Sequence, residues 1–88
     1  MSDTLFDEAM LREIVANQLS ERNPPHTTAT LLRLTMKGMS RDEATDYIVC
    51  ALAAELMAME ADGAPFNLER YQGFLDTLPE MPWADDEE

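Results

Sequence analysis

The sequence holds one cysteine, one histidine and no long uncharged run, and each scarcity removes a class of protein. The single cysteine, Cys50, cannot form an internal disulfide, which argues against a disulfide-stapled secreted domain. The first eight residues lack the basic and apolar regions of a signal peptide, so we expect a cytoplasmic protein. No uncharged apolar stretch reaches about 18 residues, so we expect no transmembrane helix.

Basic side chains are also scarce. Six Lys and Arg face 18 Asp and Glu, which gives a net charge of −12. A surface of that sign repels phosphates and anionic lipids, so we expect direct binding to neither nucleic acid nor membrane. Hydrophobic residues make up 45% of the chain, a normal share for a globular protein, and its 88 residues suit one domain.

Strand alternation and hairpin turns are lacking, whereas helix caps and apolar periodicity are present. The sequence predicts four helices, over residues 4–20, 25–37, 41–62 and 68–78. Asp3 and Asn67 are the expected N-caps of the first and fourth helices. The third helix begins at a capping box, in which Ser40 and Glu43 each bond the backbone N–H of the other. Gly63 is expected to end it.

The third helix is the most unusual element, because every residue from 47 to 59 except Glu55 is apolar. A helix that is apolar all round must be covered all round, so we expect the other helices to pack about it. Three short helices would not cover it fully, and this predicts a homodimer. The expected fold is therefore all-α, a four-helix bundle over residues 1–79 with an acidic tail over residues 80–88.

The buried faces of the other helices follow from spacing. The first helix has a stripe of Leu11, Ile14, Val15 and Leu19, and the fourth has Leu68, Tyr71, Leu75 and Leu78. The second helix has Ala29, Leu32 and Met36 on one side and Leu31 and Leu34 on the other, which predicts that it is sandwiched. Gly73 interrupts the fourth helix, where a small residue is expected to allow close helix approach.

Several caps and core positions form an ordered pattern: Asn23-Pro24-Pro25, Leu31 to Leu34, Gly38-Met39-Ser40, Glu43-Ala44, Ile48, Leu52, and Pro65 to Tyr71. This order, over residues 14–78, resembles a group of small bacterial proteins that form a domain of unknown function. The resemblance implies an all-helical bacterial protein and no particular activity. The relatives often carry histidine near positions 43–46, where this chain has none, so the resemblance supports no metal site there.

Few residues suggest chemistry. His26 has no cysteine or second histidine partner, so we expect an exposed first-turn residue rather than a ligand or catalyst. Cys50 is expected to be buried and inert. Asp42 and Asp46 share a helix face and could hold a divalent cation, although capping and the helix dipole already explain an acidic first turn. We therefore expect no cofactor and regard the metal site as the weaker hypothesis.

Glu55, Met59 and Trp83 are the candidate partner-binding residues. The Glu55 carboxylate lies in an apolar stripe, so it must reach solvent, protonate or pair with a cation, such as Arg12, Arg33 or Lys37. Two interpretations stay open: a buried polar contact that fixes the register of a dimer, or an exposed helix edge. Met59 would belong to an adaptable methionine surface or to the core. Trp83 would either recognise a partner or fold back over the bundle.

The leading hypothesis is a non-enzymatic, acidic protein-interaction module that pairs with itself through the exposed edge of its third helix. No Ser-His-Asp set, phosphate-binding glycine loop or Cys-x-x-Cys motif favours an enzyme. One alternative is an acidic decoy that mimics nucleic acid and occupies a basic protein groove. Another is a divalent-metal-binding protein that uses Asp42 and Asp46.

Overall fold

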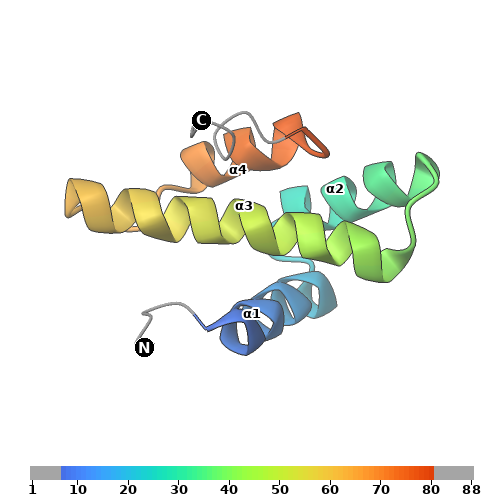
Figure 1. Ribbon diagram of the computed structural model, residues 1–88, viewed down its shortest axis with the longest axis horizontal. Coiled ribbons are helices and arrows are strands. Elements are labelled where there is room, and N and C mark those ends of the chain that lie inside the picture. The colour runs from blue at the N-terminus through green and yellow to red at the C-terminus, as the bar shows by residue number, and fades with distance from the viewer. Residues whose placement is uncertain (1–6, 81–88) are drawn as a thin grey trace.

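The computed structural model describes residues 7–80. Its helices are α1 (Glu8–Glu21), α2 (Pro25–Met36), α3 (Arg41–Asp62) and α4 (Leu68–Thr77) (Figure 1). No β-strand occurs within the described residues. The all-α fold predicted from the sequence is confirmed, whereas the predicted tail lies outside this range except for Glu80.

Helix α3 is the centre of the bundle, as predicted. It packs against each of the other helices, with α1 on one side and α2 and α4 on the other (Figure 1). Helix α2 also contacts α1 and α4. The buried apolar residues form one connected cluster: Leu11, Val15, Leu31, Leu34, Ala44, Ile48, Val49, Ala51, Leu52, Tyr71, Leu75 and Leu78.

Local side-chain chemistry sets the ends of α3 and α4. Ser40 Oγ accepts a hydrogen bond from the Glu43 N–H at 3.0 Å, which confirms the predicted N-cap of α3. Helix α3 ends at Gly63, whose φ of 65° is the left-handed conformation that glycine adopts readily. At α4, Asn67 Oδ1 accepts from the Arg70 N–H at 3.0 Å.

Helix α1 begins later than the sequence predicted. Its N-cap is Asp7, whose side chain accepts from the Ala9 N–H, and the predicted cap Asp3 lies outside the described residues. Aspartate is a favoured N-cap residue, and the structure places the cap at Asp7, four residues after the predicted position. The helix ends at Arg22 in the left-handed conformation, with φ of 56°.

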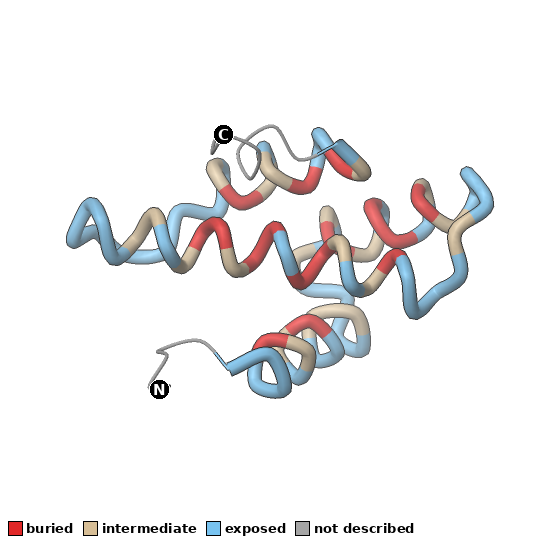
Figure 2. Tube along the Cα trace, in the orientation of Figure 1, coloured by how far each residue is buried: buried red, intermediate tan, exposed pale blue. Residues whose placement is uncertain are grey.

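The predicted sandwich of α2 is wrong, because only one side of this helix is covered (Figure 2). Leu31 and Leu34 are buried, whereas Leu32 is 60% exposed and Met36 is 77% exposed. Helices α1, α3 and α4 all contact α2, and the residues of α2 that they bury lie on one side of it. That side includes buried threonines, whose hydroxyls bond to Gln18 Oε1 and to a backbone carbonyl.

Polar contacts fasten α4 to α1 and α2. Gln18 Oε1 accepts from the Thr27 and Tyr71 hydroxyls, at 3.0 and 2.9 Å, and so joins three helices. The Arg33 guanidinium donates to the carbonyls of Leu75 and Leu78 at 2.8 and 2.7 Å. These carbonyls are at the C-terminal end of α4, where the helix has no following turn to supply further N–H donors and where positive charge is favoured. The bundle therefore holds α4 at both its face and its end.

Two expectations for α4 need correction. Leu68 is 44% exposed rather than buried, because it lies in the first turn, beside the connection from α3. Gly73 is exposed, and a Cβ built there would meet nothing within 4 Å. The glycine therefore does not provide for a close helix approach. The remaining members of the predicted stripe are buried.

Two leucines of α2 test which of its sides belongs to the core. We expect Leu34→Ala to lower the free energy of unfolding by about 3 kcal/mol, because it leaves a cavity among buried side chains. Leu32→Ala, the matched control, should cost less than about 1 kcal/mol. Urea denaturation at low protein concentration measures both. Equal losses would show that the outer side of α2 is covered.

Gly73 is a position where a substitution should stabilise the protein rather than destabilise it. We expect Gly73→Ala to raise the free energy of unfolding by roughly 0.5–1 kcal/mol, because alanine favours a helix interior and the added Cβ meets open space. Thermal denaturation followed by circular dichroism measures the change. A lower melting temperature would mean that another group occupies that space.

Candidate functional site

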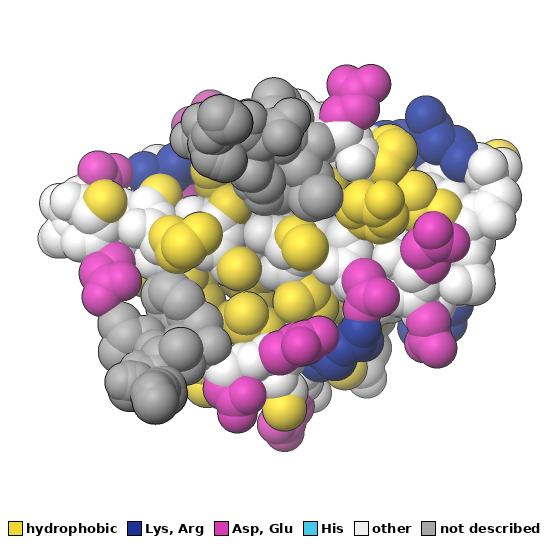
Figure 3. Space-filling view, in the orientation of Figure 1, with side chains coloured by type: hydrophobic (Ala, Val, Ile, Leu, Met, Phe, Trp, Pro, Cys, Tyr) yellow, Lys and Arg dark blue, Asp and Glu magenta, His cyan; other side chains and the backbone are white. Residues whose placement is uncertain are grey.

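The candidate site is a strip of α3 that the other helices leave open. Tyr47, Cys50, Ala53 and Met57 recur at helical spacing on this side, and we call them the α3 face. Cys50 is exposed and Met57 is 55% exposed, while the other two are partly covered. Apolar side chains follow α3 across the molecule, and acidic side chains border them (Figure 3). The central helix is thus both core and surface.

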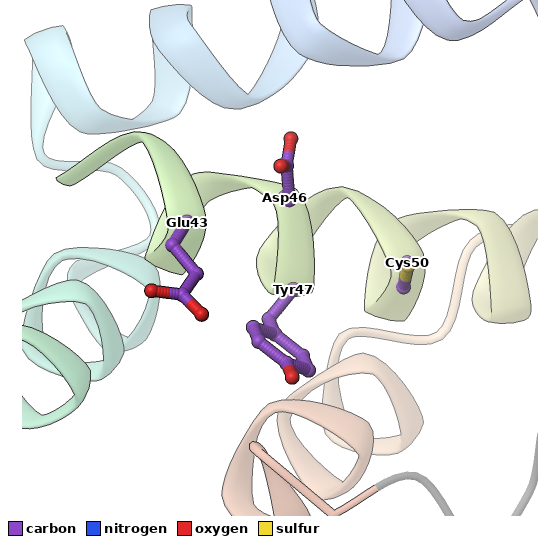
Figure 4. Close-up of a pocket in the computed structure, with 4 residues that line it drawn as sticks. All are labelled: Glu43, Asp46, Tyr47 and Cys50. Carbon is purple, nitrogen blue, oxygen red and sulfur yellow. The ribbon is translucent and has the colours of Figure 1, made fainter. Parts of the chain in front are cut away.

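A pocket of about 360 Å³ lies on the N-terminal half of this face. It is lined by Glu43, Asp46, Tyr47 and Cys50, all from α3. Asp46 is directed toward α1, while Tyr47 is directed toward α4 (Figure 4). The pocket is therefore an open trough along one helix, flanked by its neighbours, rather than an enclosed cavity.

The two carboxylates of the pocket differ in their partners. Asp46 forms an ion pair with Arg12 of α1, and Arg12 also lies 3.6 Å from a Glu8 oxygen. The Glu43 carboxylate makes no ion pair or hydrogen bond within residues 7–80, so the predicted second half of the capping box is missing. Among the residues that the structure describes, Glu43 is therefore the unpaired anion of the trough.

The Cys50 thiol borders the same trough, although the sequence predicted that it would be buried. The prediction failed because the apolar run faces solvent on this side of α3. Partial burial and the negative charge of Glu8 raise the pKa of Cys50, so the thiol stays protonated at neutral pH. This arrangement suits contact with apolar groups rather than nucleophilic chemistry.

Glu55 faces the opposite way and is completely buried. Its Oε1 accepts from Arg70 Nε at 2.7 Å, and its Oε2 accepts from Arg70 Nη2 at 3.1 Å. The Asn67 N–H donates to Oε2 at 2.8 Å. Arg70 also donates to Asp62 at 2.7 Å. The carboxylate thus binds α3 to the beginning of α4.

This geometry lowers the pKa of Glu55. Burial alone would raise the pKa of that carboxyl, but the hydrogen bonds from Arg70 and Asn67, with the positive charge of Arg70, outweigh burial. The hydrogen bonds to Glu55 and Asp62 also raise the pKa of Arg70. Glu55 is therefore ionised in the folded protein at neutral pH.

The predicted partners of Glu55 are wrong. Arg12 pairs with Asp46, Arg33 binds backbone carbonyls, and Lys37 lies exposed at the end of α2. Neither open interpretation holds, because Glu55 is neither exposed nor available to another molecule. One signal pointed to Arg70: the short connection over residues 63–67 turns α4 back along α3. Residues near the end of α3 and near the beginning of α4 that face each other across such a turn are in contact.

Of the other candidate partner residues, Met59 is partly covered near the C-terminal end of α3. Trp83 lies outside the described residues. His26 is partly buried rather than exposed, and its Nε2 lies 2.6 Å from Asp76 Oδ1, a contact between α2 and α4 that the sequence did not suggest.

The residues of the metal hypothesis are not gathered into a site. Asp42 and Asp46 are both exposed on α3, and Asp46 is engaged by Arg12. Within the described part of the chain, no three His, Cys, Asp or Glu side chains are close enough to hold a metal ion. An additional acidic ligand from another helix would be needed to complete such a site.

Comparison with protein-family models, with curated proteins and with solved structures finds no match. The resemblance to small bacterial helical proteins therefore stays a prediction. Across residues 7–80, no helix is long and apolar enough to span a membrane.

The buried carboxylate makes a prediction about pH. Because folding lowers the pKa of Glu55, its ionised form stabilises the folded state above the ordinary value of 4.5. That contribution is lost as the pH falls through the lower folded value. We expect Glu55→Gln to be less stable than wild type by roughly 1–3 kcal/mol at pH 7, with a gap that narrows in acid. Urea denaturation at a series of pH values measures the gap.

Glu60→Gln is the matched control, since Glu60 is an exposed glutamate on the same helix. Its difference from wild type should be small at every pH. A Glu55→Gln gap that stays constant or widens as the pH falls would contradict the lowered pKa of Glu55.

Proposed function

We propose that this protein is a non-enzymatic protein-interaction module that pairs with itself through the α3 face. The supporting observation is the exposure of Met57 and Cys50, in line with Tyr47, on the most apolar helix of the chain. Contact with another protein would remove these side chains from water and gain about 25 cal/mol for each Å² of apolar surface buried. A trough along a helix also suits a second helix laid into it.

The net charge of −12 opposes self-association, because two copies repel each other. At an ionic strength of about 0.15 M, charges separated by more than about 8 Å are largely screened. The short-range contact at the apolar strip then decides the balance. The acidic surface would limit contact to orientations that keep its carboxylates apart, and so favour one mode of pairing.

The positions of the reactive groups favour binding over catalysis. The Cys50 thiol on α3 has a raised pKa. His26 lies on α2, where its ring nitrogen contacts the Asp76 carboxylate of α4. A nucleophile and its base must lie within hydrogen-bond reach of each other, and these two side chains belong to separate contacts. We also propose a cytoplasmic location, which rests on the use of a single cysteine.

The decoy alternative has less support. Mimicry of a phosphate backbone needs carboxylates spaced along one continuous face. The exposed carboxylates of the described residues are spread over α1, α3 and α4, and on the face seen in Figure 3 apolar side chains come between them. This distribution favours a protein contact with an acidic border.

The mass of the protein in solution tests the proposal. We expect wild type to exceed the monomer mass of 9.9 kDa at tens of micromolar by sedimentation equilibrium. Met57→Glu should raise the dissociation constant about tenfold or more, because it places a charge in the apolar contact. Leu68→Glu, the control, adds the same charge at an exposed leucine on α4 and should have a much smaller effect.

A wild-type protein that stays strictly monomeric over this concentration range would reject self-pairing. Equal weakening by Met57→Glu and Leu68→Glu would point to general charge repulsion and reject the α3 face as the contact. Circular dichroism of each variant establishes that the fold is unchanged before the masses are compared.

A further inference from the structure

A second uncovered apolar strip lies on α2. Ala29, Leu32 and Met36 follow one another at helical spacing on its outer side, and all three are exposed. We call them, together with Lys37 at the end of the helix, the α2 face. Leu32 and Met36 are more exposed than any other large apolar side chain of the described residues. Within its own chain this face has no cover from residues 7–80.

The charge at the end of the α2 face is opposite in sign to the net charge of the protein. Lys37 and Arg41, on either side of the turn between α2 and α3, are exposed and form no ion pair within residues 7–80. The other cations near the core are engaged by carboxylates or carbonyls, as described above. Figure 3 shows basic side chains over the end of α2. The α2 face therefore ends in positive charge that no described carboxylate pairs.

The α3 face has the complementary character. It is an apolar strip of similar kind, bordered by acidic side chains, and its unpaired anion among the described residues is Glu43. A symmetric contact between two α3 faces would bring together the acidic borders of both copies, which is unfavourable. A contact between an α3 face and an α2 face joins apolar to apolar and anion to cation.

The two faces are also adjacent in the chain. The α2 face ends at Lys37 and the trough of the α3 face begins at Glu43, with only the turn between the helices separating them. A two-fold axis near this turn would place Lys37 of each copy beside Glu43 of the other. Both contacts would then form at once, and the assembly would close as a dimer rather than extend as a filament.

We propose, on the basis of the self-association argued above, that the α3 face of one copy receives the α2 face of a second copy. Lys37 of one copy pairs with Glu43 of the other, and Leu32 and Met36 cover the apolar strip. This pairing assigns a role to the side of α2 that the bundle leaves open and to Lys37, which forms no ion pair within residues 7–80.

Charge reversal tests the pairing, with a control of equal net charge. Lys37→Glu and Arg22→Glu each change the net charge from −12 to −14, since each replaces +1 by −1. Arg22 is exposed, forms no ion pair within residues 7–80, and lies near the other end of α2, roughly 18 Å away along the helix. By sedimentation equilibrium, we expect Lys37→Glu to raise the dissociation constant at least tenfold and Arg22→Glu to raise it less than about threefold.

The reciprocal variant Glu43→Lys completes the test. Alone it should also associate weakly, because Lys37 of one copy would then face the introduced ammonium group of the other. An equimolar mixture of the two variants should associate more tightly than either variant alone, since one copy of each brings opposite charges together again. Glu43 contributes only its backbone N–H to the Ser40 cap, so the substitution keeps that bond, and circular dichroism checks the fold.

The outcomes separate this inference from the proposed function. A monomeric wild type would overturn both. A wild type that associates and is weakened by Met57→Glu, but in which Lys37→Glu behaves like Arg22→Glu, would overturn the α2–α3 pairing and leave self-association through the α3 face intact. Weak association of both variants without recovery in the mixture would also overturn the pairing of Lys37 with Glu43.

Discussion

The organisation of this protein depends on one constraint: α3 is apolar on nearly all sides, and the three shorter helices cover only part of its surface. A helix that is apolar on one side needs one neighbour, whereas α3 is apolar nearly all round. In a chain of 88 residues the surface available for burial is limited. The bundle therefore buries the side of α3 that carries Ile48 and Leu52 and leaves the side that carries Cys50 and Met57 in contact with solvent.

The buried carboxylate decides which side is covered. Apolar packing is non-directional, so an all-apolar helix could accept α4 at several angles around its axis. Glu55 removes this freedom, because its charge must meet the Arg70 guanidinium and the Asn67 N–H on burial. Since Asn67 also caps α4, the same contact sets where that helix begins. The ion pair therefore positions the beginning of α4, while the contacts of Gln18 and Arg33 hold its face and its end.

Much of the local structure could be predicted from the sequence, because caps and glycine turns act over a few residues. Ser40, Asn67 and Gly63 fix helix ends by bonds within one turn. Beside the Asn67 cap, the rings of Phe66 and Tyr71 meet edge to face with their centres 5.5 Å apart. The number of helices and the central place of the third followed from the same local patterns. The helix ends do not depend on how the helices pack, and the central place of α3 was predicted because its apolar run needs cover on most sides.

Contacts between distant residues could not be predicted in this way. The apolar stripe of Ala29, Leu32 and Met36 predicts a buried face. The bundle instead buries the side that carries Thr27 and Thr30, whose hydroxyls donate hydrogen bonds there. The pairs of Gln18 with Tyr71 and of Glu55 with Arg70 require the relative placement of α1, α3 and α4. Periodicity shows that two sides of α2 are apolar and does not show which one the chain itself covers.

The charges beside the two uncovered apolar strips, on α2 and on α3, differ in sign. If acidic residues surrounded both open strips equally, each would repel its counterpart on another copy, and apolar exposure would be a liability without specificity. Instead the exposed cations Lys37 and Arg41 flank the turn where α2 ends, and Glu43, whose carboxylate is unpaired within residues 7–80, lies two residues after Arg41. Opposite charges thus mark the adjoining ends of two apolar strips. Because repulsion opposes the association of strongly acidic chains, such local complementarity is the feature that would make one orientation of two copies more favourable than the rest.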